Sequence, residues 1–214
     1  MNTFILSFLS QKGGAGKSTG ARTFAVELAK DSTGSVLLAD LDNQQATCVD
    51  WGTRRNLAGF NPALTAISFR NVRELMKQAP HFDSVVIDGL PHASQSALDA
   101  ANVSDVIVIP TKVSLDDLKP NVRFANELVK CGIERDIIAF MLNQTVDSSS
   151  QNRQAKEYLS EYFILEGSIK LMPGYVEALD AGKSLAETSY KPLNERVMEV
   201  IRSFENRFIT GVAV

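Results

Sequence analysis

The feature that most constrains this chain is a glycine-rich turn between an apolar run and a helical pattern. The apolar run TFILSFL covers residues 3–9, the turn GGAGKST covers residues 13–19, and apolar side chains then recur at helical spacing over residues 21–28. The glycines let the backbone turn tightly and aim its N–H groups at an anion, and the following helix adds a favourable dipole. This order predicts a phosphate-binding loop, with a turn that binds no ligand as the alternative.

Apolar runs of strand length alternate with helical patterns along the whole sequence. Several runs are apolar on both faces, as in strands buried within a parallel sheet. A last amphipathic helix is expected after Pro192. The alternation predicts a three-layer α/β/α fold with a mostly parallel, twisted central sheet, in a single domain over residues 1–214. The runs are residues 3–9, 35–41, 64–69, 84–88, 105–110 and 137–143.

The composition is that of an ordinary globular protein, with 44% apolar and 22% charged residues. No apolar run approaches the roughly 20 residues needed to cross a bilayer. Cys48 and Cys131 lack the spacing of a zinc site, an iron–sulfur site or a disulfide framework, which favours a cytoplasmic setting. The net charge of −3 gives no overall attraction to nucleic acid, so DNA binding would require a local basic patch.

Lys17 and Ser18 supply the chemistry that a phosphate loop requires. The Lys17 ammonium would reach the β- and γ-phosphates of a nucleotide, and the Ser18 hydroxyl would bind Mg²⁺. The backbone of the loop would surround the phosphates. The residues expected to bind nucleotide here are Gly13, Gly14, Ala15, Gly16, Lys17, Ser18 and Thr19.

Lys12 stands before the glycines, where an ordinary phosphate loop needs no charge. The strict pattern GxxxxGK[ST] is not met, because Gln11 occupies its first glycine, and the sequence reads KGGxGK[ST]. In this respect the chain resembles the deviant Walker A box of the ParA/MinD family of ATPases. The resemblance implies a phosphate-loop NTPase fold, ATP or ADP with Mg²⁺, and a homodimer that forms on ATP binding. Lys12 would then be the signature lysine that contacts the partner chain's nucleotide.

Carboxylates follow two of the predicted strands. Asp40 and Asp42 end one run and Asp88 ends another. The carboxyl ends of parallel strands form the ligand crevice, and phosphoryl transfer needs carboxylates to hold Mg²⁺ and to orient water. The resemblance implies that Asp42 orients the attacking water, that Asp40 supports the Mg²⁺ shell and that Asp88 is the Walker B aspartate. An ordinary strand-end turn is the alternative for each of them, and it is the preferred interpretation for Asp83.

Two segments depart from the family pattern. Asn43 replaces a usual proline, and DGLP at residues 88–91 replaces the commoner DTPP. Both lie in switch loops, so they bear on loop conformation and on the rate of ATP hydrolysis. His92 follows the second switch, where a solvated loop histidine is the expected interpretation.

Two further residues are expected near the base of the nucleotide. Asn143 ends the run 137–143, and the resemblance places an adenine-contacting asparagine there. Pro173 lies where a backbone segment of the family flanks the base. Turn chemistry is the alternative for either residue.

The resemblance also implies a function. Small ParA proteins partition plasmids or chromosomes: the ATP dimer binds nonspecific DNA, and a centromere-binding or adaptor protein stimulates ATP hydrolysis and release. Because this chain starts at its first strand, we expect the short, nucleoid-associated type without a helix-turn-helix extension, with slow intrinsic turnover. Dimerisation could align a basic patch, with solvated surface charges as the alternative. Its candidates are Lys170, Lys183, Lys191, Arg196 and Arg202.

Other functions of the superfamily fit less well. A MinD-like protein would carry a basic, amphipathic C-terminal anchor, and the tail SFENRFITGVAV has few cations. A positioner of a protein cargo would use the same motor. An iron–sulfur reductase needs cluster cysteines and a tyrosine autokinase needs a terminal tyrosine cluster, neither of which is present. A metabolic ligase that forms an acyl phosphate remains open.

Overall fold

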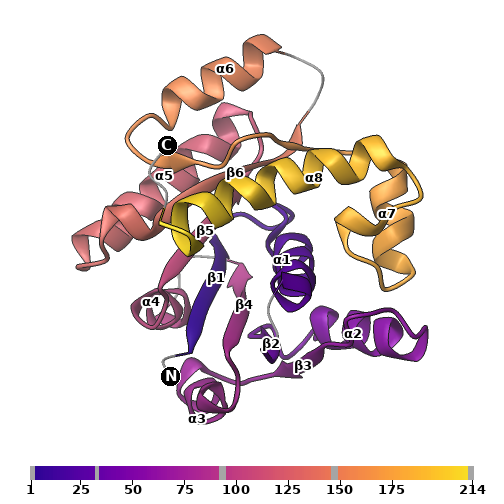
Figure 1. Ribbon diagram of the computed structural model, residues 1–214. Helices are drawn as coiled ribbons and strands as arrows, with labels where there is room; N and C mark the ends of the chain where they lie inside the picture. Colours follow the sequence, from indigo (N-terminus) through magenta and orange to yellow (C-terminus); the bar gives the residue numbers. More distant parts are fainter. Residues whose placement is uncertain (1–2, 32–33, 92–94, 146–148, 212–214) are drawn as a thin grey trace.

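A computed structural model describes residues 3–31, 34–91, 95–145 and 149–211 of the chain (Figure 1). His92 lies outside these residues. The strands are β1 Phe4–Ser10, β2 Val36–Asp40, β3 Thr65–Ser68, β4 Ser84–Pro91, β5 Val106–Thr111, β6 Ile138–Thr145, β7 Phe163–Ile164 and β8 Ile169–Lys170. The α-helices are α1 Lys17–Asp31, α2 Thr47–Leu57, α3 Val72–Gln78, α4 Gln95–Asn102, α5 Leu115–Lys130, α6 Ser149–Tyr158, α7 Pro173–Asp180 and α8 Lys191–Phe204. Short 3₁₀ turns cover Ala79–His81, Arg135–Ile137 and Leu185–Glu187, and a π turn covers Glu205–Ile209.

The central sheet has the strand order β3-β2-β4-β1-β5-β6-β7, with β8 also paired to β6. Every strand pairing among the described residues is parallel. All six predicted strands are present, so the predicted fold class is confirmed. The sequence did not indicate β7 and β8, because a strand of two residues is too short to show an alternating pattern.

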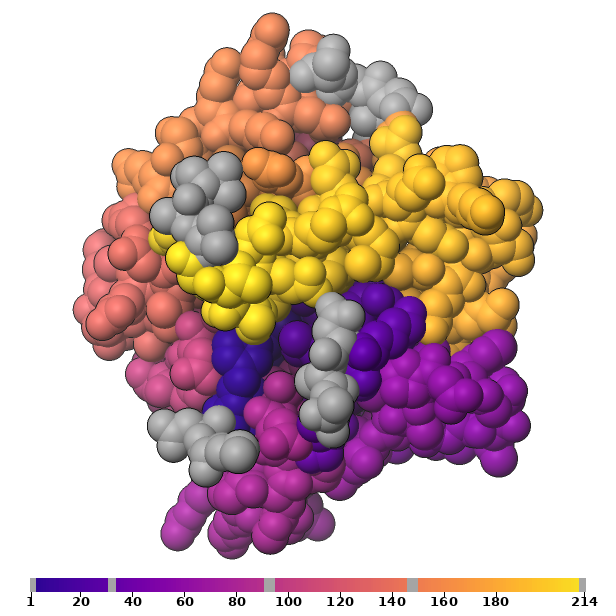
Figure 2. Space-filling view, in the orientation of Figure 1, coloured from indigo at the N-terminus to yellow at the C-terminus, as the bar shows by residue number. Residues whose placement is uncertain are grey.

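Helices cover both faces of the sheet. Along β1, Leu6 and Phe8 enter one core while Ile5 and Leu9 enter the other, as the alternation of a strand requires. The first core is completed by side chains from α1, α2, α7 and α8, and the second by side chains from α3, α4, α5 and α6. Figure 2 shows α8 as a yellow band between the salmon and orange residues of α5 and α6 and the purple residues of α2.

Aromatic packing fixes α1 beneath the glycine-rich turn. Phe24 of α1 lies edge-to-face between Phe8 of β1 and Phe204 of α8, with ring centroids 5.1 Å apart in both pairs. Such pairs contribute about 0.5–1.5 kcal/mol each beyond the area that they bury. The N-terminus of α1 therefore has a fixed position at the end of β1.

A buried ion pair fixes α2 to the C-terminal part of the chain. The Arg55 side chain is fully buried and donates to both carboxylate oxygens of Glu187, at 2.7 and 3.0 Å. It also donates to the carbonyls of Asn61, Pro62 and Gly182. Each of the three guanidinium nitrogens therefore has at least one hydrogen-bond acceptor. A buried charge is tolerated when it is paired and hydrogen-bonded in this way.

Candidate nucleotide and metal site

The glycine-rich turn connects β1 to α1 at the carboxyl edge of the sheet. Gly14 has a φ of 70° and Gly16 a φ of 106°, which are left-handed conformations that favour glycine. A Cβ atom at Gly16 would collide with the Asn143 side chain. The two glycines are therefore required by backbone conformation at both positions and by close approach at the second.

The end of β6 holds the turn from one side. The Asn143 amide donates to the Ala15 carbonyl at 2.8 Å, and the Gln144 amide donates to the Gly14 carbonyl at 3.2 Å. Gln144 itself has a φ of 50°, an unusual conformation for a residue with a side chain. Such strain is commonly found at functional sites. The sequence placed Asn143 near the base, and the structure places its amide nitrogen on the loop backbone.

Helix α5 holds the segment before the glycines. The Ser10 hydroxyl donates to the Asn121 side chain at 2.9 Å and accepts from the Lys12 backbone N–H at 3.2 Å. The Gln11 amide donates to the Glu127 carboxylate at 3.3 Å. No ion pair between described residues includes Lys12, so its half-buried side chain is not bound to a carboxylate of the described part of the chain.

Lys17 lies inside the turn. Its side chain is buried, and its ammonium donates to the Lys12 carbonyl at 3.4 Å. Burial lowers the pKa of Lys17, while the charges of Asp88 and Asp42 oppose that change. The predicted phosphate lysine and two of the predicted carboxylates are thus within electrostatic range of one another.

Asp88 lies in the buried part of β4 and has an oxygen without a hydrogen-bond partner among the described residues. Burial raises the pKa of Asp88 to about 6, although the nearby Ser18 hydroxyl and Cys48 thiol oppose the rise. The Cys48 thiol donates to one carboxylate oxygen, Oδ2, at 3.2 Å. The other oxygen, Oδ1, is buried and has no hydrogen-bond partner among the described residues. A buried carboxylate oxygen without a donor is what a metal ion or its bound water would satisfy.

Asp40 is the register partner of Asp88 on the neighbouring strand β2. Its carboxylate accepts from the Asp42 N–H at 2.9 Å and from the Cys48 N–H at 2.8 Å. The side chain is fully buried, and burial raises its pKa. Asp40 therefore shapes the turn into α2, where Ala46 has a φ of 46° and supplies no side-chain cap.

The two aspartates and Cys48 form one buried cluster. A ligand atom from each of the three lies within 4.8 Å of the others. Carboxylate oxygens are the ligands that Mg²⁺ prefers, so Asp88 fits that ion and the thiol does not. Of the three residues predicted at the metal, Ser18 and Asp88 could hold Mg²⁺ at the end of the loop. Asp40 is adjacent, with both of its oxygens already accepting backbone N–H groups.

Asp42 lies two residues beyond the end of β2. Its carboxylate oxygen Oδ1 accepts from the Gln45 N–H at 3.2 Å, and its carbonyl accepts from the Ala46 N–H at 2.7 Å. The side chain is half-buried. Unlike Asp40, it does not use both carboxylate oxygens to accept backbone N–H groups of the described residues, which leaves it able to orient a water molecule beside Lys17. Its predicted role stays a prediction.

Two further positions that the sequence analysis singled out, Pro173 and Asp83, lie in other elements of the fold. Pro173 begins α7, three residues after β8, which pairs with Asn143 of β6. Asp83 accepts from the N–H and hydroxyl of Ser35, in agreement with the turn role preferred for it.

The five predicted DNA contacts do not form one stripe. Lys191, Arg196 and Arg202 are exposed on α8, but Arg196 lies roughly 120–140° around the helix from the other two, at about 100° per residue. Lys183 is half-buried, with its ammonium 5.1 Å from the Phe60 ring centroid. Lys170 lies in β8. Their binding to DNA stays a prediction.

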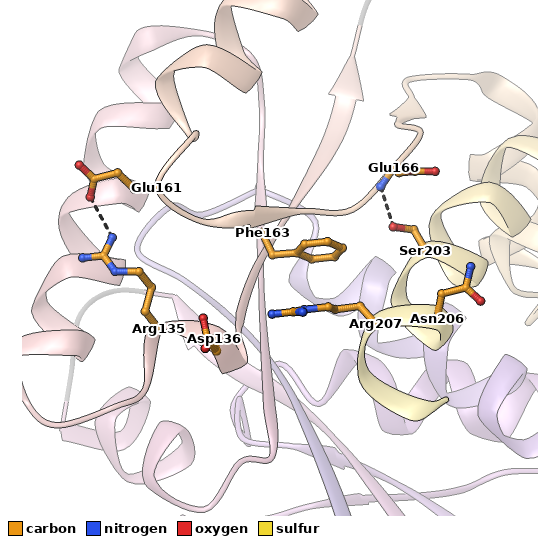
Figure 3. A pocket seen from close by; sticks show the side chains of 8 residues that line it. All are labelled: Arg135, Asp136, Glu161, Phe163, Glu166, Ser203, Asn206 and Arg207. Carbon is orange, nitrogen blue, oxygen red and sulfur yellow. Dashed lines mark hydrogen bonds and ion pairs between the residues drawn. The ribbon is translucent and has the colours of Figure 1, made fainter. Parts of the chain in front are cut away.

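A hollow of about 300 Å³ lies near the amino ends of β6 and β7, away from the glycine-rich turn (Figure 3). Arg207 lies under the Phe163 ring there, with its guanidinium 5.4 Å from the ring centroid. Arg135 pairs with Glu161 at 2.8 Å. Asp136, Glu161 and Glu166 outnumber the two arginines of the lining, so this hollow does not suit a nucleotide's phosphates.

Several residues at the site were not predicted. Cys48 contacts Asp88, Asn121 contacts Ser10 and Gln144 contacts the glycine-rich turn, and no motif in the sequence singled out any of the three. Arg22 of α1 was also missed, although its charge opposes the pKa rise of both Asp40 and Cys48. No helix among the described residues is long and apolar enough to cross a membrane.

Comparison with known proteins agrees with this geometry. The family described as "CobQ/CobB/MinD/ParA nucleotide binding domain" matches residues 6–208. The chain is 30% identical over 115 residues to "Maintenance of carboxysome distribution protein A" of Gloeobacter kilaueensis, a match that spans 53% of this chain and 51% of that protein, about half of its length.

Two solved structures have the same fold. The ATP complex of a single-residue variant of Cyanothece McdA superposes with a TM-score of 0.75 at 19% identity, covering 95% of this chain and 96% of the other. The septum site-determining protein MinD of Pyrococcus horikoshii OT3 with Mg-ADP gives 0.76 at 19% identity, covering 98% of each chain.

Proposed function

Because the chain belongs to the CobQ/CobB/MinD/ParA family of nucleotide-binding domains, we propose that it is an ATPase that positions a cellular cargo. MgATP binding would pair two chains, and hydrolysis of ATP to ADP and phosphate would separate them. The observation that carries the proposal is the unsatisfied, buried Oδ1 of Asp88 beside Lys17 and the glycine-rich turn.

The residues of this chain divide the work of nucleotide binding. The backbone of Gly13–Thr19 surrounds the phosphates, Lys17 contacts the β- and γ-phosphates, and Ser18 and Asp88 hold the metal. Mg²⁺ held by Ser18 and Asp88 would supply positive charge that neutralises the phosphates. Asn143 and Pro173 would flank the base of the nucleotide.

Lys12 completes a partner's site in this proposal. The phosphates of its own nucleotide are served by Lys17 and the loop amides, and Lys12 has no ion pair within the described chain. Its ammonium is therefore available to a nucleotide held by a second copy. ATP binding and dimerisation then become one event.

Asp42 orients the attacking water. Its half-buried carboxylate lies within electrostatic range of Lys17 and outside the fully bonded cluster around Asp40. Intrinsic turnover is slow in this proposal, since a partner protein stimulates hydrolysis. Asn43 and the segment Asp88–Pro91, which depart from the family pattern, would change the rate of ATP hydrolysis.

The cargo is either DNA, as in plasmid or chromosome partition, or a protein assembly. The named relative, which maintains carboxysome distribution, favours an assembly as cargo. In both cases the ATP dimer would bind nonspecific DNA in the cytoplasm. A MinD-like attachment to the membrane is the second candidate, since MinD is among the proteins with this fold.

The decisive experiment measures dimerisation and binding together. MgATP should convert the wild-type chain to a dimer in sedimentation, and the dimer should be retained on nonspecific DNA in a salt-sensitive way but not on liposomes. Lys12→Ala should bind nucleotide as a monomer and form no dimer, while Asp42→Ala should accumulate the ATP dimer. Dimerisation and turnover by Lys12→Ala would overturn the proposed role of Lys12. Retention on liposomes alone would favour the membrane candidate.

A further inference from the structure

A groove of about 580 Å³ runs between α5 and the end of α6, outside the nucleotide site. Three cations line it from α5, at positions i, i+4 and i+11, so they share one face of the helix over about 16 Å of its length. None of the three takes part in an ion pair between described residues. We call this set the α5 stripe; it consists of Lys119, Arg123 and Lys130.

The α5 stripe is a locally cationic surface in a chain whose net charge is −3. Among the described residues the lining contains one carboxylate, that of Glu127, which accepts a hydrogen bond from the Gln11 amide. All three cations of the stripe are exposed. Uncompensated cations on one helix face attract an anionic partner and steer its approach.

We propose that this groove is the docking site for an acidic segment of a partner protein. The groove also contains Val122 and the ring of Tyr158, which is 43% exposed. Apolar and tyrosine side chains within a charged rim are typical of protein interfaces, whereas a phosphate backbone asks only for positive charge.

The position of Glu127 further favours a peptide over DNA. It lies on α5 between Arg123 and Lys130, so an occupant must omit a negative charge at that point. A peptide can place an uncharged residue there, while a phosphodiester chain carries a charge at every nucleotide. Acidic side chains on alternate residues of an extended peptide lie about 6.6 Å apart, close to the rise of about 6 Å between Lys119 and Arg123.

The groove is connected directly to the segment that carries Lys12. Glu127 accepts from Gln11, and Asn121 on the same helix accepts from Ser10, whose hydroxyl holds the Lys12 N–H. A segment that restrains α5 therefore restrains the backbone before the glycines. The inference deepens the proposed function, since it identifies where a stimulating partner could act.

The test uses a short fluorescent peptide of alternating glutamate and glycine, titrated with the full chain and followed by anisotropy. The variant Lys119→Gln/Arg123→Gln/Lys130→Gln is expected to bind it at least about tenfold more weakly, with a smaller salt dependence. The matched control is Arg73→Gln/Lys77→Gln, an exposed i, i+4 pair on α3. It should retain the wild-type affinity within about twofold, because exposed charges farther than about 10 Å away are screened.

Three results would overturn the docking site. These are unchanged binding by the triple variant, equal weakening in the control, or duplex DNA that displaces the peptide and itself loses affinity in the triple variant. Circular dichroism establishes that both variants are folded. Because peptide binding is measured without nucleotide, this test can fail while MgATP dimerisation succeeds, and the reverse is equally visible.

Coupling to the loop has its own measurement. By reciprocity, MgATP is expected to change the affinity of the peptide by about fivefold or more in the wild type. Glu127→Ala should still bind the peptide but show a smaller MgATP dependence, because the contact with Gln11 is removed while that of Asn121 with Ser10 remains. A peptide affinity that ignores MgATP in the wild type would refute the coupling.

Discussion

The neighbouring strands β2 and β4 carry two buried aspartates in register, yet the two have opposite hydrogen-bond environments. Asp40 at the end of β2 accepts two backbone N–H groups, whereas Asp88 on β4 accepts one thiol and keeps Oδ1 unsatisfied among the described residues. Burial raises the pKa of both carboxyls, so burial alone does not separate them. Their partners do: Asp40 stabilises a turn, and Asp88 is left with an oxygen for a ligand.

The largest expected effect tests the structural half of this comparison. Asp40→Ala leaves the buried N–H groups of Asp42 and Cys48 without an acceptor. At about 1–3 kcal/mol for each unsatisfied group, the loss should be about 3 kcal/mol of unfolding free energy. Urea denaturation measures it. Asp40→Asn keeps one acceptor and should lose less; equal losses in the two variants would show that the hydrogen bonds are not the cause.

Asp88→Asn tests the ligand half. Removing the carboxylate charge should lower Mg²⁺-dependent ATP hydrolysis about 100-fold, the upper range for groups that act at or next to a metal. Stability should be unchanged or higher, since an unsatisfied buried carboxylate is costly. Steady-state hydrolysis and thermal melting provide the two readouts. Asp50→Asn, at an exposed position on α2, is the control; a large loss of stability in Asp88→Asn with normal turnover would reverse the assignment.

The raised pKa of Asp88 should make the stability of the folded chain depend on pH. Asp88 has a pKa of about 6 in the folded chain against about 4 when unfolded, so the folded state binds a proton more tightly. Its stabilising contribution is present below about pH 4 and is lost as pH rises through about 6, by about 3 kcal/mol.

The pKa of Glu187 is shifted in the opposite direction, so its contribution to stability has the opposite pH dependence. Burial acts to raise its pKa, but the Arg55 side chain, the Ser184 N–H and Lys30 hold it at about 2. Its contribution is present above about pH 4.5 and is lost as pH falls towards about 2. Urea midpoints should therefore be highest near about pH 4–5 in the wild type, and Asp88→Asn should remove the fall between about pH 4 and 6. A fall of the same size in that variant would assign it to another group.

The smallest effect concerns Cys48. Cys48→Ala leaves Asp88 Oδ2 without its donor, whereas Cys48→Ser retains one. The alanine variant should change Mg²⁺ affinity by less than about tenfold, corresponding to about 1 kcal/mol for a single hydrogen bond. A Mg²⁺ titration of hydrolysis gives the value. If serine and alanine behave alike, the thiol does not position Asp88.

The fold and the loop were predictable because their signals are local. The run of residues 3–9, the glycines and Lys17 are contiguous, and strand ends carry Asp40 and Asp88 to one edge. Contacts between distant residues had no such signal: Cys48 meets Asp88 across 40 positions, and Asn121 meets Ser10 across 111. The positive φ of Gln144 likewise depends on tertiary context, because nothing about glutamine favours it.

The amide donors at the end of β6 have one more consequence. A trans peptide points its C=O and the following N–H in opposite directions. Since the Gly14 and Ala15 carbonyls are turned towards Gln144 and Asn143, the N–H groups of Ala15 and Gly16 are turned away from β6 and into the loop. The expected phosphate-binding surface is thus preorganised during folding, and a nucleotide would not need to reorient these peptides on binding.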